Sequence, residues 1–243
     1  MRKQKRSSGL PTGTAPACIQ TVAVGGLVPL VLSQAVSPLP QFVQTIIFLA
    51  VLFLAVIVHE VSHGLVAERL GDPTARRMGR LTLNPIPHID LFGTIIIPAF
   101  LLIRGSRFMI GWAKPVPVDI RRFRNPLRDF AITSLGGPVS NLLQVVAYVV
   151  LFRIYAAAGL PYWVGFVAYA GALVNLLLAL FNLIPIPPLD GSRLVAAMLP
   201  TDLAVRYLSI DRFGFMIIFA LLFLGVFRGL VGFCNATVVA ILG

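Results

Sequence analysis

The chain has 243 residues, of which 58% are hydrophobic and 12% charged, and its mean hydropathy is +0.90. A soluble domain is about half apolar and a quarter charged, so this balance excludes an ordinary globular fold and indicates a polytopic membrane protein. The formal net charge of +11 would suit a nucleic-acid-binding protein. However, the basic residues cluster between apolar runs, as in the cytoplasmic loops of membrane proteins, and we expect no nucleic-acid partner.

The N-terminal region combines a basic start, MRKQKRSS, with a moderately apolar stretch at 17–36. One interpretation is a signal peptide, with the small residues around Ser33 and Ala35 as its cleavage site. The other is a retained first transmembrane helix anchored by its cytoplasmic charges. We favour the retained helix, because the rest of the chain is itself apolar enough to lie in a membrane. Residues 1–40 then form the first unit, with a cytoplasmic N-terminus.

Several further segments match the length of about 20 mostly apolar residues that a helix needs to cross a bilayer. They are 41–65, 131–152, 162–183, and 213–227 with the apolar tail beyond it. The segment 91–103 is shorter and contains a proline, and it fits a strained span, a re-entrant hairpin or an interfacial segment. We therefore predict an all-α polytopic membrane protein. It has about six transmembrane segments, with short re-entrant or β-like loops around a buried site.

The distribution of charge orients these segments in the membrane. The segment 104–128 carries seven basic residues and one acid, and 69–80 carries four basic residues and one acid. Both are expected to be cytoplasmic, so 91–103 must dip in and return or lie along the surface. The protein is then a multi-pass protein of the cell membrane, with a core at 41–200 and a C-terminal transmembrane unit at 201–243.

An uncharged run of seventeen residues, 42–58, leads directly into His59-Glu60-Val61-Ser62-His63. On a helix, the spacing HExxH places two imidazoles on one face about one turn apart. They can then share a zinc ion while Glu60 acts as the general base. Ionisable groups inside a membrane are costly and mark functional sites. We therefore predict one zinc ion bound by His59 and His63.

A catalytic zinc ion normally has a third protein ligand. Asp190 is the preferred candidate, because it is the only carboxylate between Asp129 and Asp202 and a lone buried carboxylate is costly unless it is paired or metal-bound. Asp190 would otherwise cap the helix that follows it. The alternative ligands are His88 and Asp90, which would otherwise anchor their loop.

Three sequence elements occur in a fixed order: HExxH at 59–63, Gly-Pro-x-x-Asn at 137–141, and Asn-x-x-Pro-x-x-Pro-x-Asp-Gly at 182–191. This order resembles the site-2 protease family of intramembrane zinc metalloproteases over roughly residues 42–200. The segment 111–118, GWAKPVPV, resembles the membrane-associated loop of compact prokaryotic members. No long polar stretch leaves room for the PDZ domain that some bacterial members carry.

The resemblance implies that His59, His63 and Asp190 bind zinc and that Glu60 is the base. It also implies that Asn141 helps to hold the substrate or its developing oxyanion, although a buried Asn can also join transmembrane helices. Asn182, on the other hand, fits either a bond to the broken backbone near the prolines or a contact with the substrate.

These observations favour an intramembrane zinc endopeptidase that cleaves membrane-anchored regulatory proteins near the cytoplasmic face, in regulated intramembrane proteolysis. Its partners are then a transmembrane protein substrate and the lipid bilayer, and no oligomeric state is predicted. The alternatives are a membrane zincin of another type, and a transporter or catalytically inactive chaperone-like relative.

Overall fold

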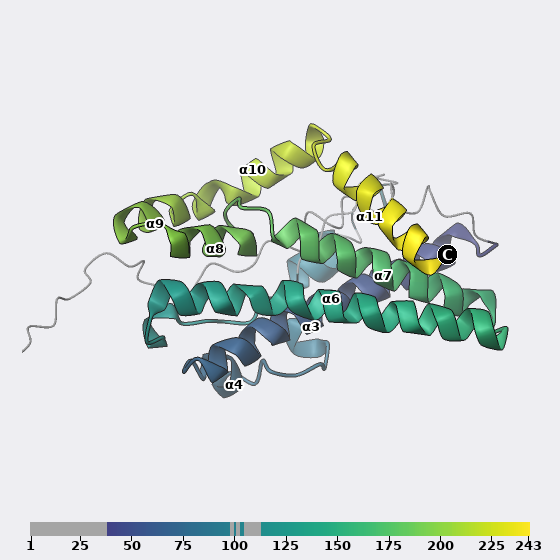
Figure 1. Cartoon of the computed structure of the whole chain (residues 1–243), viewed down its shortest axis with the longest axis horizontal. Helices are drawn as coiled ribbons and strands as arrows, with labels where there is room; N and C mark the ends of the chain where they lie inside the picture. The colour runs from purple at the N-terminus through teal and green to yellow at the C-terminus, as the bar shows by residue number, and fades with distance from the viewer. Residues whose placement is uncertain (1–37, 98–99, 101–102, 105–112) are drawn as a thin grey trace, which may run out of the picture.

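The computed structural model describes residues 38–97, 100, 103–104 and 113–243. In these ranges the fold is helical and contains no β-strand, in agreement with the predicted all-α class (Figure 1). The predicted first helix at 17–36 lies outside the described residues, as does the start of the segment 111–118.

Three helices are long and apolar enough to cross a membrane: α3 (Gln41–Arg69), α6 (Pro126–Ala158) and α7 (Tyr162–Asn182). They confirm the predicted apolar segments at 41–65, 131–152 and 162–183. Helix α6 extends beyond its predicted segment at both ends, because its ends are set by Pro126 and Gly159 and not by the limits of the apolar run. Pro126 stands at its start, where a missing N–H costs nothing, and Gly159 ends it in the left-handed conformation, with φ 61°.

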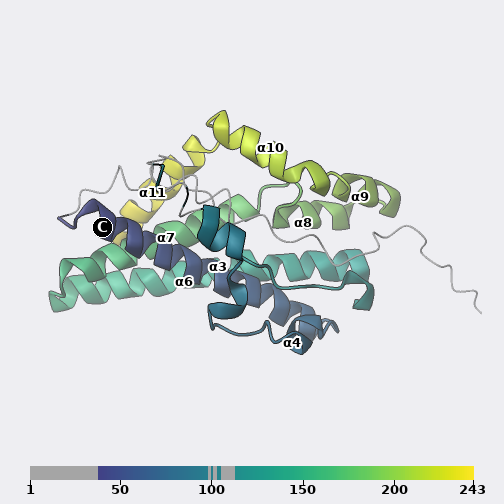
Figure 2. The ribbon, with the colours of Figure 1, turned by 180° about the vertical axis from the view of Figure 1, so that it is seen from behind.

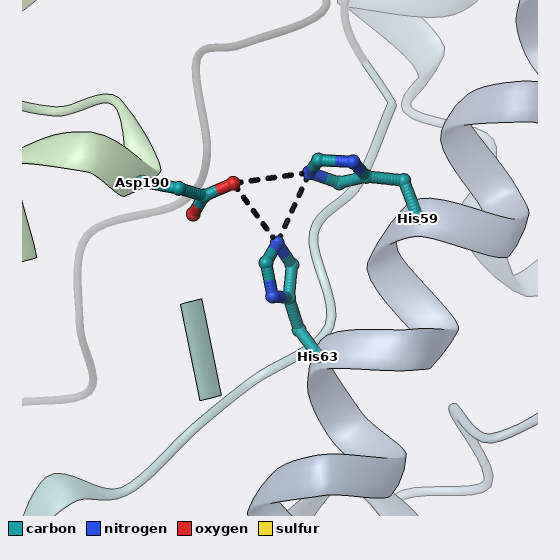
Figure 3. A group of neighbouring side chains, drawn as sticks. All are labelled: His59, His63 and Asp190. Carbon is teal, nitrogen blue, oxygen red and sulfur yellow. Dashed lines mark hydrogen bonds and ion pairs between the residues drawn. The ribbon is translucent and has the colours of Figure 1, made fainter. Parts of the chain in front are cut away.

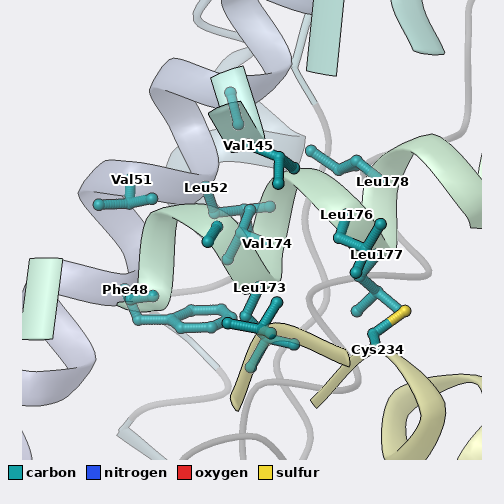
Figure 4. Packing of buried hydrophobic residues seen from close by; sticks show 14 of the residues in the cluster. Phe48, Val51, Leu52, Val145, Leu173, Val174, Leu176, Leu177, Leu178 and Cys234 are labelled. Carbon is teal, nitrogen blue, oxygen red and sulfur yellow. The ribbon is translucent and has the colours of Figure 1, made fainter. Parts of the chain in front are cut away.

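The core lies where α3, α6 and α7 pack against one another. Phe48 and Leu52 of α3 lie beside Leu173 and Val174 of α7, and all four side chains are buried (Figure 4). Small residues let α6 and α7 approach closely. A Cβ atom at Gly171, for example, would lie 2.4 Å from the ring of Tyr148. Close approach through small residues is the usual packing of membrane helices, since apolar burial alone does not hold them together in lipid.

The C-terminal part consists of α8 (Asp190–Met198), α9 (Thr201–Leu208), α10 (Asp211–Phe223) and α11 (Arg228–Leu242). The sequence predicts a further span at 213–227 and leaves open whether the apolar tail beyond it continues the same helix. The chain breaks after α10, and Met216–Phe223 and Arg228–Leu242 meet at a 74° bend. Gly225 supplies the break, because its φ of 73° is a conformation that other residues rarely adopt.

The described residues therefore contain three candidate spans, or four if the bent pair of α10 and α11 is counted as one. About six were predicted for the whole chain, and that number is not confirmed. The predicted segment 91–103 is helical over Leu91–Ile96, but residues 98–99 and 101–102 lie outside the described part.

Short elements connect α3 to α6. The first of them, α4 (Thr74–Arg77), lies on the side of α6 opposite to α8, α9 and α10 in both views (Figure 1, Figure 2). After α4 the chain makes a short turn at Ile86–His88. The residues 113–119 then run without helical structure before a second turn, at Ile120–Arg122. Buried Asp72 joins the start of α4 to the end of the segment 113–119. Its carboxylate accepts hydrogen bonds from the backbone N–H groups of Thr74 and Asp119, the latter at 2.7 Å.

Candidate metal centre

His59 and His63 of α3 meet Asp190, the first residue of α8, in a buried triangle (Figure 3). The two imidazole Nε2 atoms are 3.0 Å apart, and Asp190 Oδ2 lies 3.3 Å from each. The two histidines share a helix face because they are four residues apart. Among the residues that the structure describes, these three form the one group of His, Cys, Asp and Glu side chains with the spacing of a metal site.

The triangle has the dimensions of a zinc site. Zinc is held tetrahedrally at roughly 2.0–2.2 Å by imidazole nitrogen and carboxylate oxygen, which places neighbouring ligand atoms about 3.3 Å apart. The observed separations are 3.0 and 3.3 Å. Moreover, Asp190 Oδ2 is buried and accepts no hydrogen bond, although it faces two imidazole nitrogens. The three residues therefore fit a zinc ion in both geometry and chemistry.

Asp190 reaches the histidines because the chain folds back sharply after α7. Gly191 makes this possible: a Cβ atom there would lie 2.1 Å from the carbonyl oxygen of Leu183. The side chain of Arg193 stabilises the turn before Asp190 by donating a hydrogen bond to the carbonyl oxygen of Leu189 at 2.8 Å. The N-cap position of α8 is taken by Leu189, and Asp190 is the first residue of the helix, so it does not stand where the alternative of a helix cap would place it.

The ring nitrogen of each histidine that points away from the triangle is held by α6. His59 Nδ1 lies 2.5 Å from Asn141 Oδ1, and His63 Nδ1 lies 2.8 Å from the carbonyl oxygen of Thr133. A carbonyl oxygen only accepts, and its contact with His63 Nδ1 is shorter than the 3.3 Å contact of the Gly137 N–H with the same nitrogen. We therefore assign the proton of His63 to Nδ1, which leaves Nε2 as the ligand atom. The amide of Asn141 donates to Asn175 and so turns its oxygen toward His59, and the same assignment follows for the imidazole of His59.

Asn141 connects His59 to a second buried asparagine, Asn175. Its Nδ2 donates to Asn175 Oδ1 at 2.7 Å, and Asn175 Nδ2 donates to the carbonyl oxygen of Gly171 at 2.9 Å. Asn141 and Asn175 are fully buried. The oxygen and the nitrogen of the Asn141 amide are thus both engaged by other side chains of the protein. Asn175 was not singled out from the sequence, because an Asn in an apolar helix carries no motif.

Gly137 marks the point where α6 passes closest to the triangle. A Cβ atom there would lie 2.4 Å from His59 Cε1 and 2.5 Å from His63 Nε2. The glycine of the Gly-Pro-x-x-Asn element is therefore a steric requirement of the site. The sequence signal that indicates this is a glycine directly before a proline in an apolar helix, where both residues are otherwise unfavourable.

Glu60 is buried, and its carboxylate contacts the segment 113–119. Its Oε2 accepts a hydrogen bond from the backbone N–H of Val116 at 3.0 Å. Arg80, also buried, donates to the carbonyl oxygen of Lys114 at 2.6 Å and so holds the same segment in place. The described part of the sequence element 111–118 therefore lies directly against HExxH.

His88 and Asp90 do not join the metal group. His88 Nε2 contacts the carbonyl oxygen of Thr82 at 2.9 Å, and the carboxylate of Asp90 accepts from the N–H of Gly93 at 2.7 Å. Burial lowers the pKa of His88. Both side chains anchor their loop, as the alternative interpretation of the sequence predicted.

Asn182 is the last residue of α7 and is fully buried. Neither atom of its amide group has a hydrogen-bond partner. The interpretation that its side chain bonds to the broken backbone is therefore not borne out. A buried polar group without a partner is rare and calls for an explanation.

A HExxH helix of membrane-spanning length, completed by a buried carboxylate, defines the class of membrane metalloproteases. Comparison with known proteins agrees. The model of peptidase family M50 matches residues 154–225, which include Asp190. The protein named "Putative zinc metalloprotease YwhC" of Bacillus subtilis is 39% identical over 171 residues, covering 68% of this chain and 74% of that protein.

A second relative, "Putative zinc metalloprotease Rip2" of Mycolicibacterium smegmatis, is 28% identical over 218 residues, which are 89% of this chain and 82% of that protein. No solved structure matches at the same level of significance. The chain belongs to peptidase family M50, and the resemblance to the site-2 protease family is confirmed. It is a membrane metalloprotease.

Proposed function

We propose that the protein is an intramembrane zinc endopeptidase that hydrolyses peptide bonds of membrane-anchored proteins near the cytoplasmic face. The observation that carries this proposal is the buried triangle of His59, His63 and Asp190 on a helix long enough to cross a membrane. A polar set of this kind is too costly to keep at membrane depth without a function.

In this proposal His59, His63 and Asp190 hold one zinc ion. A zinc ion held there supplies a Lewis acid for the scissile carbonyl group and lowers the pKa of water. Glu60 takes the proton from the attacking water and passes it to the leaving amine. The hydrogen bond from the N–H of Val116 fixes the Glu60 carboxylate in place for this transfer.

The two asparagines take different roles. Asn141 orients the imidazole of His59, because both of its polar groups are engaged within the protein. Asn182 contacts the substrate, as a donor to the carbonyl oxygen on which negative charge develops. Its buried amide lacks a partner, which costs about 1–3 kcal/mol, and a substrate group would recover this energy.

The expected substrate is a transmembrane segment that is locally unwound. The carbonyl groups of an intact helix are engaged in hydrogen bonds, so attack needs an extended stretch. Two non-helical segments border the site, 113–119 and 183–189. Both contain prolines, and irregular backbone at membrane depth is tolerated where it is buried or lines a wet cavity.

The test is to purify the protein in detergent, measure its zinc content and follow cleavage of a synthetic transmembrane substrate. Glu60→Gln should keep one zinc ion and lose cleavage by several orders of magnitude, because only the base is removed. Asp190→Ala should lose zinc. Cleavage by Glu60→Gln at the wild-type rate would overturn the mechanism, and normal zinc content in Asp190→Ala would overturn the ligand set.

A further inference from the structure

A cavity lies far from the metal centre, between the end of α6, the start of α7 and the end of α11. Its volume is about 350 Å³, within the usual range for a small-molecule pocket. The aromatic rings that line it include those of Phe152, Tyr155 and Phe166, and the aliphatic side chains are those of Val239 and Leu242. We refer to it as the α6–α11 cavity.

The α6–α11 cavity and the metal centre lie at well separated positions along α6, which is long and apolar enough to cross a membrane. Gly137 contacts the triangle and Tyr155 lines the cavity, and both lie on the continuous helix α6. At about 1.5 Å per residue, they are roughly 27 Å apart along the axis. The hydrocarbon core of a bilayer is about 30 Å thick. A ligand in the cavity is therefore in the other leaflet and cannot touch the metal ligands.

The interior of the cavity suits an apolar chain. Its polar groups include the Tyr169 hydroxyl and the Asn235 amide, and the hydroxyl donates to Asn235 Oδ1 at 2.5 Å. Aromatic side chains with a polar tip are typical of the membrane interface, where an apolar body meets a wet edge.

An arginine side chain lies beside the lining of the cavity. Arg153 is exposed, and one of its N–H groups donates to the carbonyl oxygen of Ile241 at 2.7 Å. Its Nη1 lies 3.6 Å from the Cβ position of Gly243, a residue that lines the cavity. No ion pair of Arg153 occurs within the described residues. A guanidinium group has five N–H donors, so others remain for a phosphate group.

Arg153 is also isolated in the sequence. No other Lys or Arg occurs between Arg128 and Arg193, and the basic segment 104–128 leads into the opposite end of α6. We propose that the α6–α11 cavity binds an anionic glycerophospholipid. One acyl chain enters between the aromatic rings, and the phosphate group binds Arg153, in the leaflet opposite the metal centre. Charge complementarity and apolar lining together favour this occupant over an uncharged one.

The proposal is tested by mass spectrometry of the intact protein in detergent, titrated with phosphatidylglycerol and, separately, with phosphatidylcholine of the same chains. The wild type should bind one phosphatidylglycerol more tightly than phosphatidylcholine. Arg153→Gln should weaken phosphatidylglycerol binding about tenfold or more and leave phosphatidylcholine unchanged, because it removes a charged donor. Val239→Trp should weaken both lipids, because it fills the space of the chain.

Arg206→Gln is the matched control, since Arg206 is exposed on α9 away from the cavity, and it should bind both lipids normally. Zinc content and thermal unfolding show whether each variant is folded. Unchanged binding in folded Arg153→Gln and Val239→Trp would overturn the proposal and leave only nonspecific surface lipid. Displacement of the lipid by a transmembrane peptide, with the same dependence on Val239, would overturn it in favour of a protein ligand.

Discussion

The Nδ1 atom of His59 lies 2.5 Å from the side-chain oxygen of Asn141, on a helix that begins 57 residues after α3 ends. The contact places the proton of this imidazole on Nδ1 and leaves Nε2 for a metal ion. The Asn of Gly-Pro-x-x-Asn is thereby connected to the HExxH motif through a hydrogen bond between helices. Removal of such an outer contact lowers metal affinity without removing a ligand.

Asn141→Ala should therefore weaken zinc binding about 10–100-fold, while the protein remains folded. Asn175→Ala should have a smaller effect in the same direction, because Asn175 acts on His59 only through Asn141. The measurement is a competition titration of zinc against a chelator. Asn84→Ala is the control, because Asn84 lies in the loop between α4 and the turn at Ile86–His88, outside α6 and α7. Wild-type zinc affinity in Asn141→Ala would contradict the orienting role.

Asn182→Ala should separate binding of zinc from catalysis. We expect full zinc content and a decrease in kcat of about 10²–10³-fold, the usual cost of losing one oxyanion donor. The measurement is steady-state cleavage of a transmembrane substrate together with metal analysis. A change in KM with unchanged kcat would instead assign Asn182 to substrate binding in the ground state.

Gly137→Ala should disrupt the metal centre by steric overlap. The added methyl group would lie 2.4 Å from the ring of His59, so either the imidazole or the whole of α6 must move. We expect zinc affinity to decrease at least about tenfold, as for the loss of an orienting contact. Gly232→Ala in α11 is the control, because its methyl group would meet no atom within 4 Å. A Gly137→Ala variant with normal zinc binding would show that the helices can separate at no cost.

The stability of the protein should depend on pH through His88. Burial lowers the pKa of His88 below its ordinary value, and the neighbouring charge of Arg80 lowers it further, while Glu60 and the Thr82 carbonyl oppose this. In the unfolded chain the pKa is about 6.5. As the pH falls below about 6.5, the unfolded state binds a proton that the folded state does not, so the free energy of unfolding decreases until the folded pKa is reached.

Thermal unfolding between pH 7.5 and 5 is the measurement for this prediction. The melting temperature of the wild type should decrease more steeply with acidification than that of His88→Gln, which cannot titrate. Equal slopes for the two proteins would contradict the assignment of this pH dependence to His88.

Much of the helical framework could be predicted because its signals are local. An uncharged run of sufficient length predicts a membrane helix wherever it stands. Helices α3 and α6 contain their predicted segments, and α7 matches its own to within one residue. The sequence left open whether the last helix continues beyond 213–227, because the hydropathy of this segment is continuous across Gly225. Whether a glycine there takes a positive φ depends on the packing of the helices on either side.

By itself the sequence determined the two histidines and the base, because a spacing of four residues on a helix places His59 and His63 on one face whatever surrounds them. The sequence also indicated Asp190 as the preferred third ligand, with His88 and Asp90 as alternatives. Only the tertiary structure decided between them and showed which groups hold the site in place. Asp190 brings its carboxylate to the imidazoles, Asn141 holds His59, and Val116 holds Glu60. These contacts join residues 56 to 131 positions apart, so they depend on the relative register of packed elements, which no local pattern encodes.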